Sequence, residues 1–158
     1  MIEERQAVIA AARTWLGTPH RHRQAVKGAG VDCAMIIKEA FIEAGLAPSF
    51  DQGFYTHDWH MHRNEEVYLE TVKSYMGVVD ERPLSLNERL AENPSFSVDP
   101  ADVIMMRVGR TYSHGVIVSS WPDIIHAYFP SGMVEEVSVM GTPLMTAPTK
   151  IYSFWSKT

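Results

Sequence analysis

The chain has 158 residues, of which 46% are hydrophobic, and it carries a net charge of −5. This length supports one sizeable hydrophobic core, so residues 1–158 are expected to form a single domain. The acidic balance disfavours nucleic acid as a partner, because phosphate binding needs clustered lysine and arginine. The single cysteine excludes an internal disulfide framework and a multi-thiolate zinc site.

The first half of the chain shows helical periodicity. Apolar residues recur three to four positions apart over residues 3–16 and again over residues 33–44, and a glycine follows each run. A third helix is predicted over residues 65–76. A short fourth one is predicted over residues 85–91, with Ser85 as its N-cap and Glu88 completing a capping box.

After residue 100 the pattern changes from helical to extended. Five apolar runs are predicted to be strands, namely residues 103–108, 115–119, 124–128, 134–137 and 150–155. Helices followed by strands indicate an α+β domain, with N-terminal helices packed on a C-terminal antiparallel sheet. Glu135 and Glu136 are interpreted as part of a solvated strand edge.

The only cysteine, Cys33, follows a glycine-punctuated run and lies on the first turn of the second predicted helix. Exposed N–H groups and the positive end of the helix dipole stabilise an anion there, so the thiol should ionise more readily than a free one. A thiolate attacks carbonyl carbons. A lone cysteine is equally often a small buried hydrophobe, so both interpretations stay open at this point.

Two histidines follow on neighbouring predicted strands. His114 opens one apolar run and His126 lies in the next, with the turn-forming residues 120–123 between them. In such a hairpin His114 could accept the proton of Cys33, and His126 could hold the His114 imidazole in the required tautomer. Together these residues have the order of a nucleophile, a base and an orienting residue.

The motifs that contain these residues resemble a known family. In chain order they are Gly17-Thr18-Pro19-His20, Gly30-Val31-Asp32-Cys33, Asp99-Pro100-Ala101-Asp102-Val103-Ile104, Ser113-His114-Gly115-Val116-Ile117-Val118 and Ile125-His126-Ala127. Their order and spacing resemble the NlpC/P60 cysteine peptidases, and most closely the phage- and prophage-encoded branch associated with tail proteins. The resemblance covers most of the chain.

The resemblance implies a papain-like fold and a thiol hydrolase that cleaves amide bonds in the peptide stems of bacterial peptidoglycan, typically after a D-glutamyl residue. It implies that Cys33 is the nucleophile, His114 the general base and His126 the residue that orients it. Phage tail proteins are the partners that it implies, and no cofactor is expected.

The same resemblance points to residues that contact substrate. His20 stands where many family members have a tyrosine close to the thiol, and Asp32 retains a carboxylate before the nucleophile. Ala34 and Met35 replace the serine and glycine that commonly follow the nucleophile, so one hydroxyl that would help to bind a substrate amine is missing. His20, Asp32 and Ser113 are the substrate-binding residues expected around the thiol.

The segment His57-Asp58-Trp59-His60-Met61-His62 suggests a competing interpretation. Three histidines and an aspartate within six positions could ligate Zn²⁺. The segment lacks the helical pair spacing of common zinc hydrolases, so it is interpreted as a loop near the cleft. Trp59 and His60 are then expected to contact substrate, without a metal.

The location of the protein is a separate question. No stretch is long and apolar enough to span a bilayer, and Glu3 and Glu4 stand where a secretion signal would be basic. Cytoplasmic synthesis is therefore expected, with delivery to the cell wall in a phage particle as the resemblance implies. Three alternatives to the peptidase remain: a papain-like acyltransferase or amidase, a non-catalytic tail scaffold, and a metal-binding domain using His57, His60 and His62.

Overall fold

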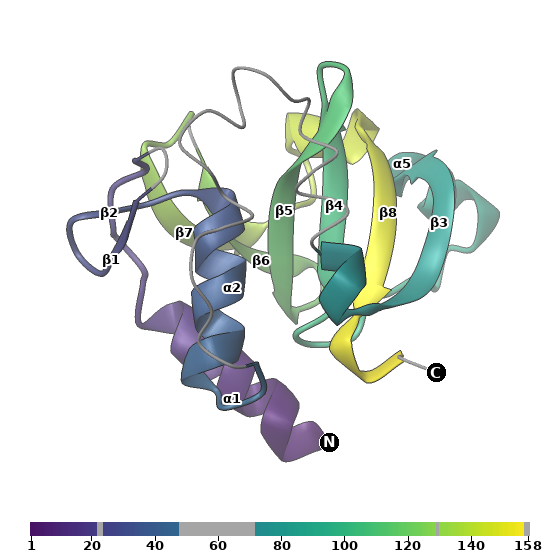
Figure 1. Cartoon of the computed structure of the whole chain (residues 1–158). Coiled ribbons are helices and arrows are strands. Elements are labelled where there is room, and N and C mark those ends of the chain that lie inside the picture. Colours follow the sequence, from purple (N-terminus) through teal and green to yellow (C-terminus); the bar gives the residue numbers. More distant parts are fainter. Residues whose placement is uncertain (22–23, 48–71, 129, 157–158) are drawn as a thin grey trace.

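The computed structural model describes residues 1–21, 24–47, 72–128 and 130–156 and shows helices packed on a curved antiparallel sheet (Figure 1). The helices are α1 (Ile2–Arg13), α2 (Cys33–Glu43) and α5 (Leu86–Glu92), with 3₁₀ turns η1 (Pro143–Thr146) and η2 (Phe154–Ser156). The strands are β1 (Ala25–Val26), β2 (Gly30–Val31), β3 (Gly77–Ser85), β4 (Val103–Val108), β5 (Thr111–Ser120), β6 (Asp123–Tyr128), β7 (Met133–Ser138) and β8 (Pro148–Ser153). The predicted α+β class is confirmed.

Within the described residues, the main sheet has six strands in the order β3-β8-β4-β5-β6-β7, and every neighbouring pair is antiparallel. Side chains alternate between the two faces of a strand, so the sheet contributes to two apolar cores. Ile117 and Ile125 face the larger core, which α1 and α2 cover. Val116 and Ile124 face the smaller core, which α5 and η1 close. Burial on both faces explains the uninterrupted apolar runs of the central strands.

The start of α2 is held by its own N-cap. Asp32 has extended backbone, and its Oδ1 accepts hydrogen bonds from the amides of Ala34 at 3.1 Å and Met35 at 3.0 Å. These bonds satisfy amides that have no partner within the helix. Gly45 then ends the helix with a φ of +78°, a conformation that favours glycine. Cys33 is thereby fixed as the first helical residue.

Several predicted boundaries were wrong, and three strands, β1, β2 and β3, were not predicted. Helix α1 ends at Arg13 rather than at residue 16, and β5 begins at Thr111 rather than at residue 115. The last strand ends at Ser153 rather than at residue 155, because η2 begins at Phe154. Strand β3 was not predicted because its charged residues and Pro83 resemble a loop, and such a sequence is tolerated at the edge of a sheet. Of the predicted third helix, residues 65–71 lie outside the described residues and residues 72–75 are helical.

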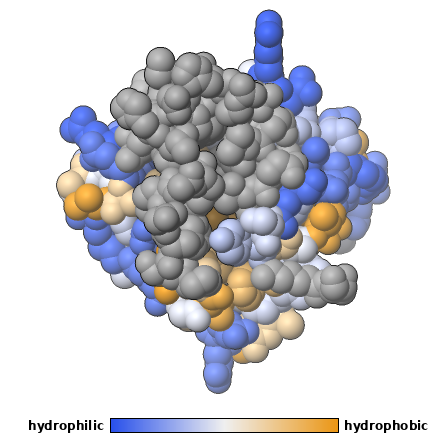
Figure 2. All heavy atoms as spheres, viewed as in Figure 1, coloured by the Kyte–Doolittle hydropathy of each residue, from blue (hydrophilic) through white to orange (hydrophobic). Residues whose placement is uncertain are grey.

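On the face shown in Figure 2, apolar residues form small patches separated by hydrophilic ones. Across the described ranges, no helix combines the length and apolar character needed to cross a membrane.

The predicted capping box of α5 is confirmed. The Ser85 hydroxyl accepts from the Glu88 amide at 3.1 Å, and the Glu88 carboxylate accepts from the Ser85 amide at 3.0 Å. Because Ser85 also joins β3 to α5, these two bonds fix the direction in which the helix leaves the sheet.

We therefore expect Ser85→Ala to lower the free energy of unfolding by about 1 kcal/mol, the usual cost of losing an N-cap hydroxyl. Urea unfolding followed by circular dichroism would measure this. Ser95→Ala is the control, because Ser95 is exposed and a surface substitution usually changes stability by less than about 0.5 kcal/mol. Equal effects of the two substitutions would contradict the role of the cap.

Candidate active site

Cys33 lies against strand β5 at the two residues that flank His114. Its thiol donates a hydrogen bond to the carbonyl oxygen of Ser113 at 3.4 Å, and the main-chain amide of Gly115 also hydrogen-bonds the sulfur. In a strand the carbonyl of one residue and the amide two positions later point to the same edge. The pairing of β5 with β6 extends from Ser120 to Ile117, so the thiol meets β5 nearer to its start. The sulfur is thus placed next to the residue predicted to be its base.

The two predicted histidines are in direct contact. The Nε2 atom of His114 lies 2.9 Å from Nδ1 of His126, and both side chains are buried. The Nε2 atom of His126 lies 2.8 Å from a carboxylate oxygen of Glu135. A polar chain thus runs from β5 through β6 to β7 inside an otherwise apolar sheet.

Glu135 was not predicted as part of the site, and the interpretation of residues 135 and 136 as a solvated edge was wrong. Strand β7 is an edge strand, but Glu135 bonds His126 and Glu136 forms a two-point ion pair with Arg13 at 2.9 and 3.0 Å. The strand pairing of the predicted hairpin could have revealed the contact between Glu135 and His126. A tight turn that pairs Tyr128 with residue 133 also places residue 135 opposite His126.

Burial shifts the pKa values of Cys33 and His114 in opposite directions. It lowers the pKa of His114 to about 3, and the charges of His126 and His20 contribute to this shift. It raises the pKa of the Cys33 thiol to about 12, and the Asp32 carboxylate adds to the shift. The expectation of a readily ionised thiol was therefore wrong, because desolvation and a neighbouring anion outweigh the helix dipole and the amide hydrogen bonds. The resting site holds a neutral thiol and a neutral imidazole.

His126 is influenced by two opposing effects. Burial lowers its pKa, while the hydrogen bond and negative charge of Glu135 raise it. Burial has the larger effect, so the pKa of His126 also lies below its ordinary value.

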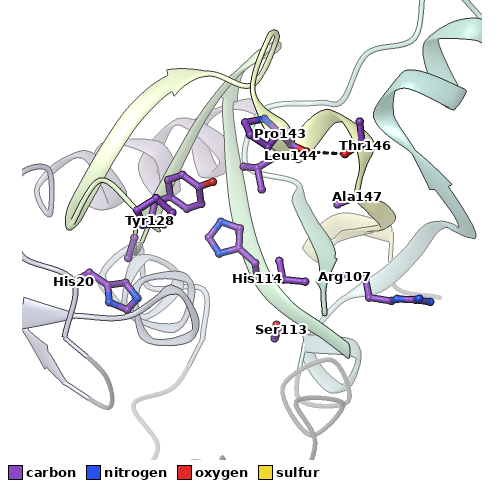
Figure 3. Close-up of a pocket in the computed structure, with 12 residues that line it drawn as sticks. His20, Arg107, Ser113, His114, Tyr128, Pro143, Leu144, Thr146 and Ala147 are labelled. Atoms are coloured by element: carbon purple, nitrogen blue, oxygen red, sulfur yellow. Dashed lines mark hydrogen bonds between the residues drawn. The ribbon is translucent and has the colours of Figure 1, made fainter. Parts of the chain in front are cut away.

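A pocket of about 560 Å³ opens beside His114 (Figure 3). His20, Ser113 and Tyr128 line it together with His114, as Figure 3 shows, and the other side is formed by Pro143 to Ala147 around η1. The amide of His20 donates to the carbonyl of Gly132 at 2.8 Å, which ties this segment to the end of the β6–β7 hairpin. The structure therefore brings His20 and Ser113 to the same pocket as His114, and their contact with substrate stays a prediction.

The remaining predicted residues divide into two groups. Asp32 is buried and uses one carboxylate oxygen to cap α2, so its contact with substrate stays a prediction. Trp59 and His60, with the whole segment 57–62, lie outside the described residues. In the parts of the chain that are described, no group of three His, Cys, Asp or Glu side chains is arranged to hold a metal ion.

The raised thiol pKa has a direct chemical consequence. Because only the thiolate is alkylated, Cys33 in the folded protein should react with iodoacetamide more slowly at pH 7 than a free cysteine, whose pKa is about 8.5. The rate should still be rising at pH 10. Protein unfolded in urea is the control and should show the ordinary midpoint. A fast rate that is constant below pH 7 would instead indicate a stable thiolate–imidazolium pair.

Comparisons with known proteins identify solved structures that share this fold. No family model matches the sequence, and no curated protein matches it. NlpC1 from Trichomonas vaginalis superposes with a TM-score of 0.61 at 15% identity, over 96% of this chain and 43% of that one. The NlpC/p60 domain of the peptidoglycan hydrolase SagA superposes with a TM-score of 0.53 at 16% identity, over 93% of this chain and 97% of that one. An N-acetylmuramoyl-L-alanine amidase from Bacteroides uniformis superposes with a TM-score of 0.58 at 8% identity, over 96% of this chain and 98% of that one.

The chain thus spans less than half the length of the Trichomonas protein and nearly all of the SagA domain and the amidase. These similarities at low identity concern the arrangement of helices and strands. The protein has the α+β fold of NlpC/P60 domains.

Proposed function

We propose that this protein is a cysteine peptidase of the NlpC/P60 type that hydrolyses amide bonds in bacterial cell-wall peptides. One observation carries the proposal: the Cys33 thiol is bonded to the strand backbone beside His114, whose imidazole is bonded to His126. We infer that, with substrate bound, these three residues act as nucleophile, base and orienting residue. Solved proteins of the same fold include a peptidoglycan hydrolase and a muramoyl-alanine amidase, which supports the substrate class.

In the acylation step the Cys33 sulfur attacks the carbonyl carbon of the scissile amide. A carbon–sulfur bond forms while the thiol proton moves to the His114 imidazole. That proton then passes to the leaving amine as the carbon–nitrogen bond breaks, which leaves a thioester on Cys33. Because thiol and imidazole are both neutral at rest, the proton moves as the new bond forms rather than before substrate binds.

In the second step a water molecule attacks the thioester. A carbon–oxygen bond forms and the carbon–sulfur bond breaks, while His114 accepts a proton from the water and returns it to sulfur. The carboxylic acid product is released and the Cys33 thiol is regenerated. The developing oxyanion lies near the N-terminus of α2, whose dipole favours negative charge. His20 lines the same pocket as His114 and is the side chain proposed to contact this oxygen in place of the family's tyrosine.

The pocket next to His114 has room for a short peptide segment, and His20 and Arg107 are the basic side chains among those that line it. Ser113, and Asp32 at the start of α2, are proposed to contact the peptide near the scissile bond. Delivery to the cell wall by a phage tail is proposed from the sequence resemblance.

Substitutions in the three catalytic positions should have unequal effects. Cys33→Ala should abolish hydrolysis of peptidoglycan stem peptides, and His114→Ala should lower kcat/KM by about 10³-fold or more. His126→Asn should retain more activity than His114→Ala, because an amide can still orient an imidazole. Product analysis by mass spectrometry would measure all three, with circular dichroism as the check on folding.

The double variant Cys33→Ala/His114→Ala should be no worse than Cys33→Ala alone, because the two groups act as a unit. Full activity of Cys33→Ala, or equal and independent losses at the three positions, would refute these roles.

A metal-dependent reaction would respond differently from a thiol-dependent one when metal ions are removed. Thiol chemistry needs no Lewis acid, so hydrolysis should survive dialysis against a strong chelator. Substituting His60 should change KM more than stability. Activity that is lost on chelation, restored by Zn²⁺ and unaffected by Cys33→Ala would instead support the metal-binding interpretation of residues 57–62.

A further inference from the structure

We propose that Glu135 is a positioning residue that fixes the tautomers of His126 and His114, so that Nδ1 of His114 is the atom that accepts the Cys33 proton. The inference rests on the proposed function. It starts from two contacts, 2.8 Å between Glu135 and His126 and 2.9 Å between His126 and His114. Each contact uses a different ring nitrogen of His126, so the state of one nitrogen decides the state of the other.

The pairing of the strands brings these side chains into contact. His126 and Glu135 are direct partners in the β6–β7 ladder, so their side chains lie on the same face of the sheet. Tyr128, two residues further along β6, stacks on His126 with ring centroids 4.6 Å apart and ring planes 16° apart. His126 is 1% exposed. Ring stacking and burial therefore leave the imidazole with one orientation, in which both of its nitrogens are engaged.

The proton positions follow from donor and acceptor chemistry. A carboxylate can only accept, so the proton shared by Glu135 and His126 belongs to Nε2 of His126. A neutral imidazole carries one proton, so Nδ1 of His126 is an acceptor. The proton between the rings must then come from Nε2 of His114. Nδ1 of neutral His114 is left with a lone pair, as a base requires.

The hydrogen bonds from Glu135 through His126 to His114 also stabilise His114 when it accepts a proton. His114 then carries a positive charge in a buried site, where an uncompensated charge is costly. The ring-to-ring hydrogen bond transmits part of that charge toward His126, and the Glu135 carboxylate already favours the protonated form of His126. Glu135 touches no substrate in this scheme and acts through the two histidines.

The neighbouring residue provides a matched control. Glu136 is next to Glu135 on β7 and has the same side chain, but among the described residues it pairs with Arg13 rather than with a histidine. Glu136→Ala removes a carboxylate from the same strand without removing an acceptor from His126. Glu135→Gln is the conservative variant, because its amide oxygen can still accept from Nε2 of His126.

The experiment measures tautomers and kinetics separately. Nitrogen NMR of the histidine rings at neutral pH should show protons on Nε2 of both His114 and His126 in the wild-type protein and in Glu136→Ala. In Glu135→Ala a fraction of His114 should carry its proton on Nδ1. With stem peptides, Glu135→Ala should lower kcat by roughly 10- to 100-fold with KM little changed, and Glu135→Gln should recover part of that loss.

The two readouts separate failure of the inference from failure of the proposed function. Unchanged tautomers and unchanged kcat in Glu135→Ala, in a protein that Cys33→Ala inactivates, would overturn the inference and leave the peptidase standing. If the wild-type protein cleaves no stem peptide, the proposed function fails, and the ring-nitrogen signals of Glu135→Ala alone then support or overturn the inference. Equal losses in Glu135→Ala and Glu136→Ala would also overturn it.

Discussion

The register of the antiparallel ladder from β5 to β7 is the constraint on which the site depends. It aligns His114, His126 and Glu135 on three successive strands, each within hydrogen-bond distance of the next. A shift of one residue in either pairing would turn a histidine or the carboxylate to the opposite face. Apolar burial on both faces of the sheet makes such a shift costly, so the packing of the core also fixes the geometry of the polar chain.

The second element of the site comes from the other half of the fold. Helix α2 covers one face of the sheet, and its N-cap Asp32 brings Cys33 to the edge of β5 beside His114. The same carboxylate that stabilises the helix start also disfavours the thiolate. The residue that stabilises the helix start therefore opposes ionisation of the thiol beside it. In the proposed mechanism this cost is avoided, because the thiol proton moves to His114 only as the new bond forms.

Burial has opposite consequences for the resting and the reacting site. It keeps thiol and imidazole neutral, so the folded protein holds no isolated charge on either group in an apolar environment. It also strengthens each hydrogen bond along the histidine chain, because little water competes for it. The carboxylate at the end of that chain is partly exposed on the edge strand and contacts the buried rings through His126.

The sequence by itself determined the locally encoded features: the helical period of α1 and α2, the capping box at Ser85, the central strands, and Cys33 at a helix start. These depend on residues a few positions apart, so a pattern is enough to find them. Only the tertiary structure decided the contact of Glu135 with His126, the presence of β3 at the sheet edge and the direction of the Cys33 pKa shift. Each of these depends on which distant groups surround a side chain and how much water they exclude, and local sequence does not record either quantity.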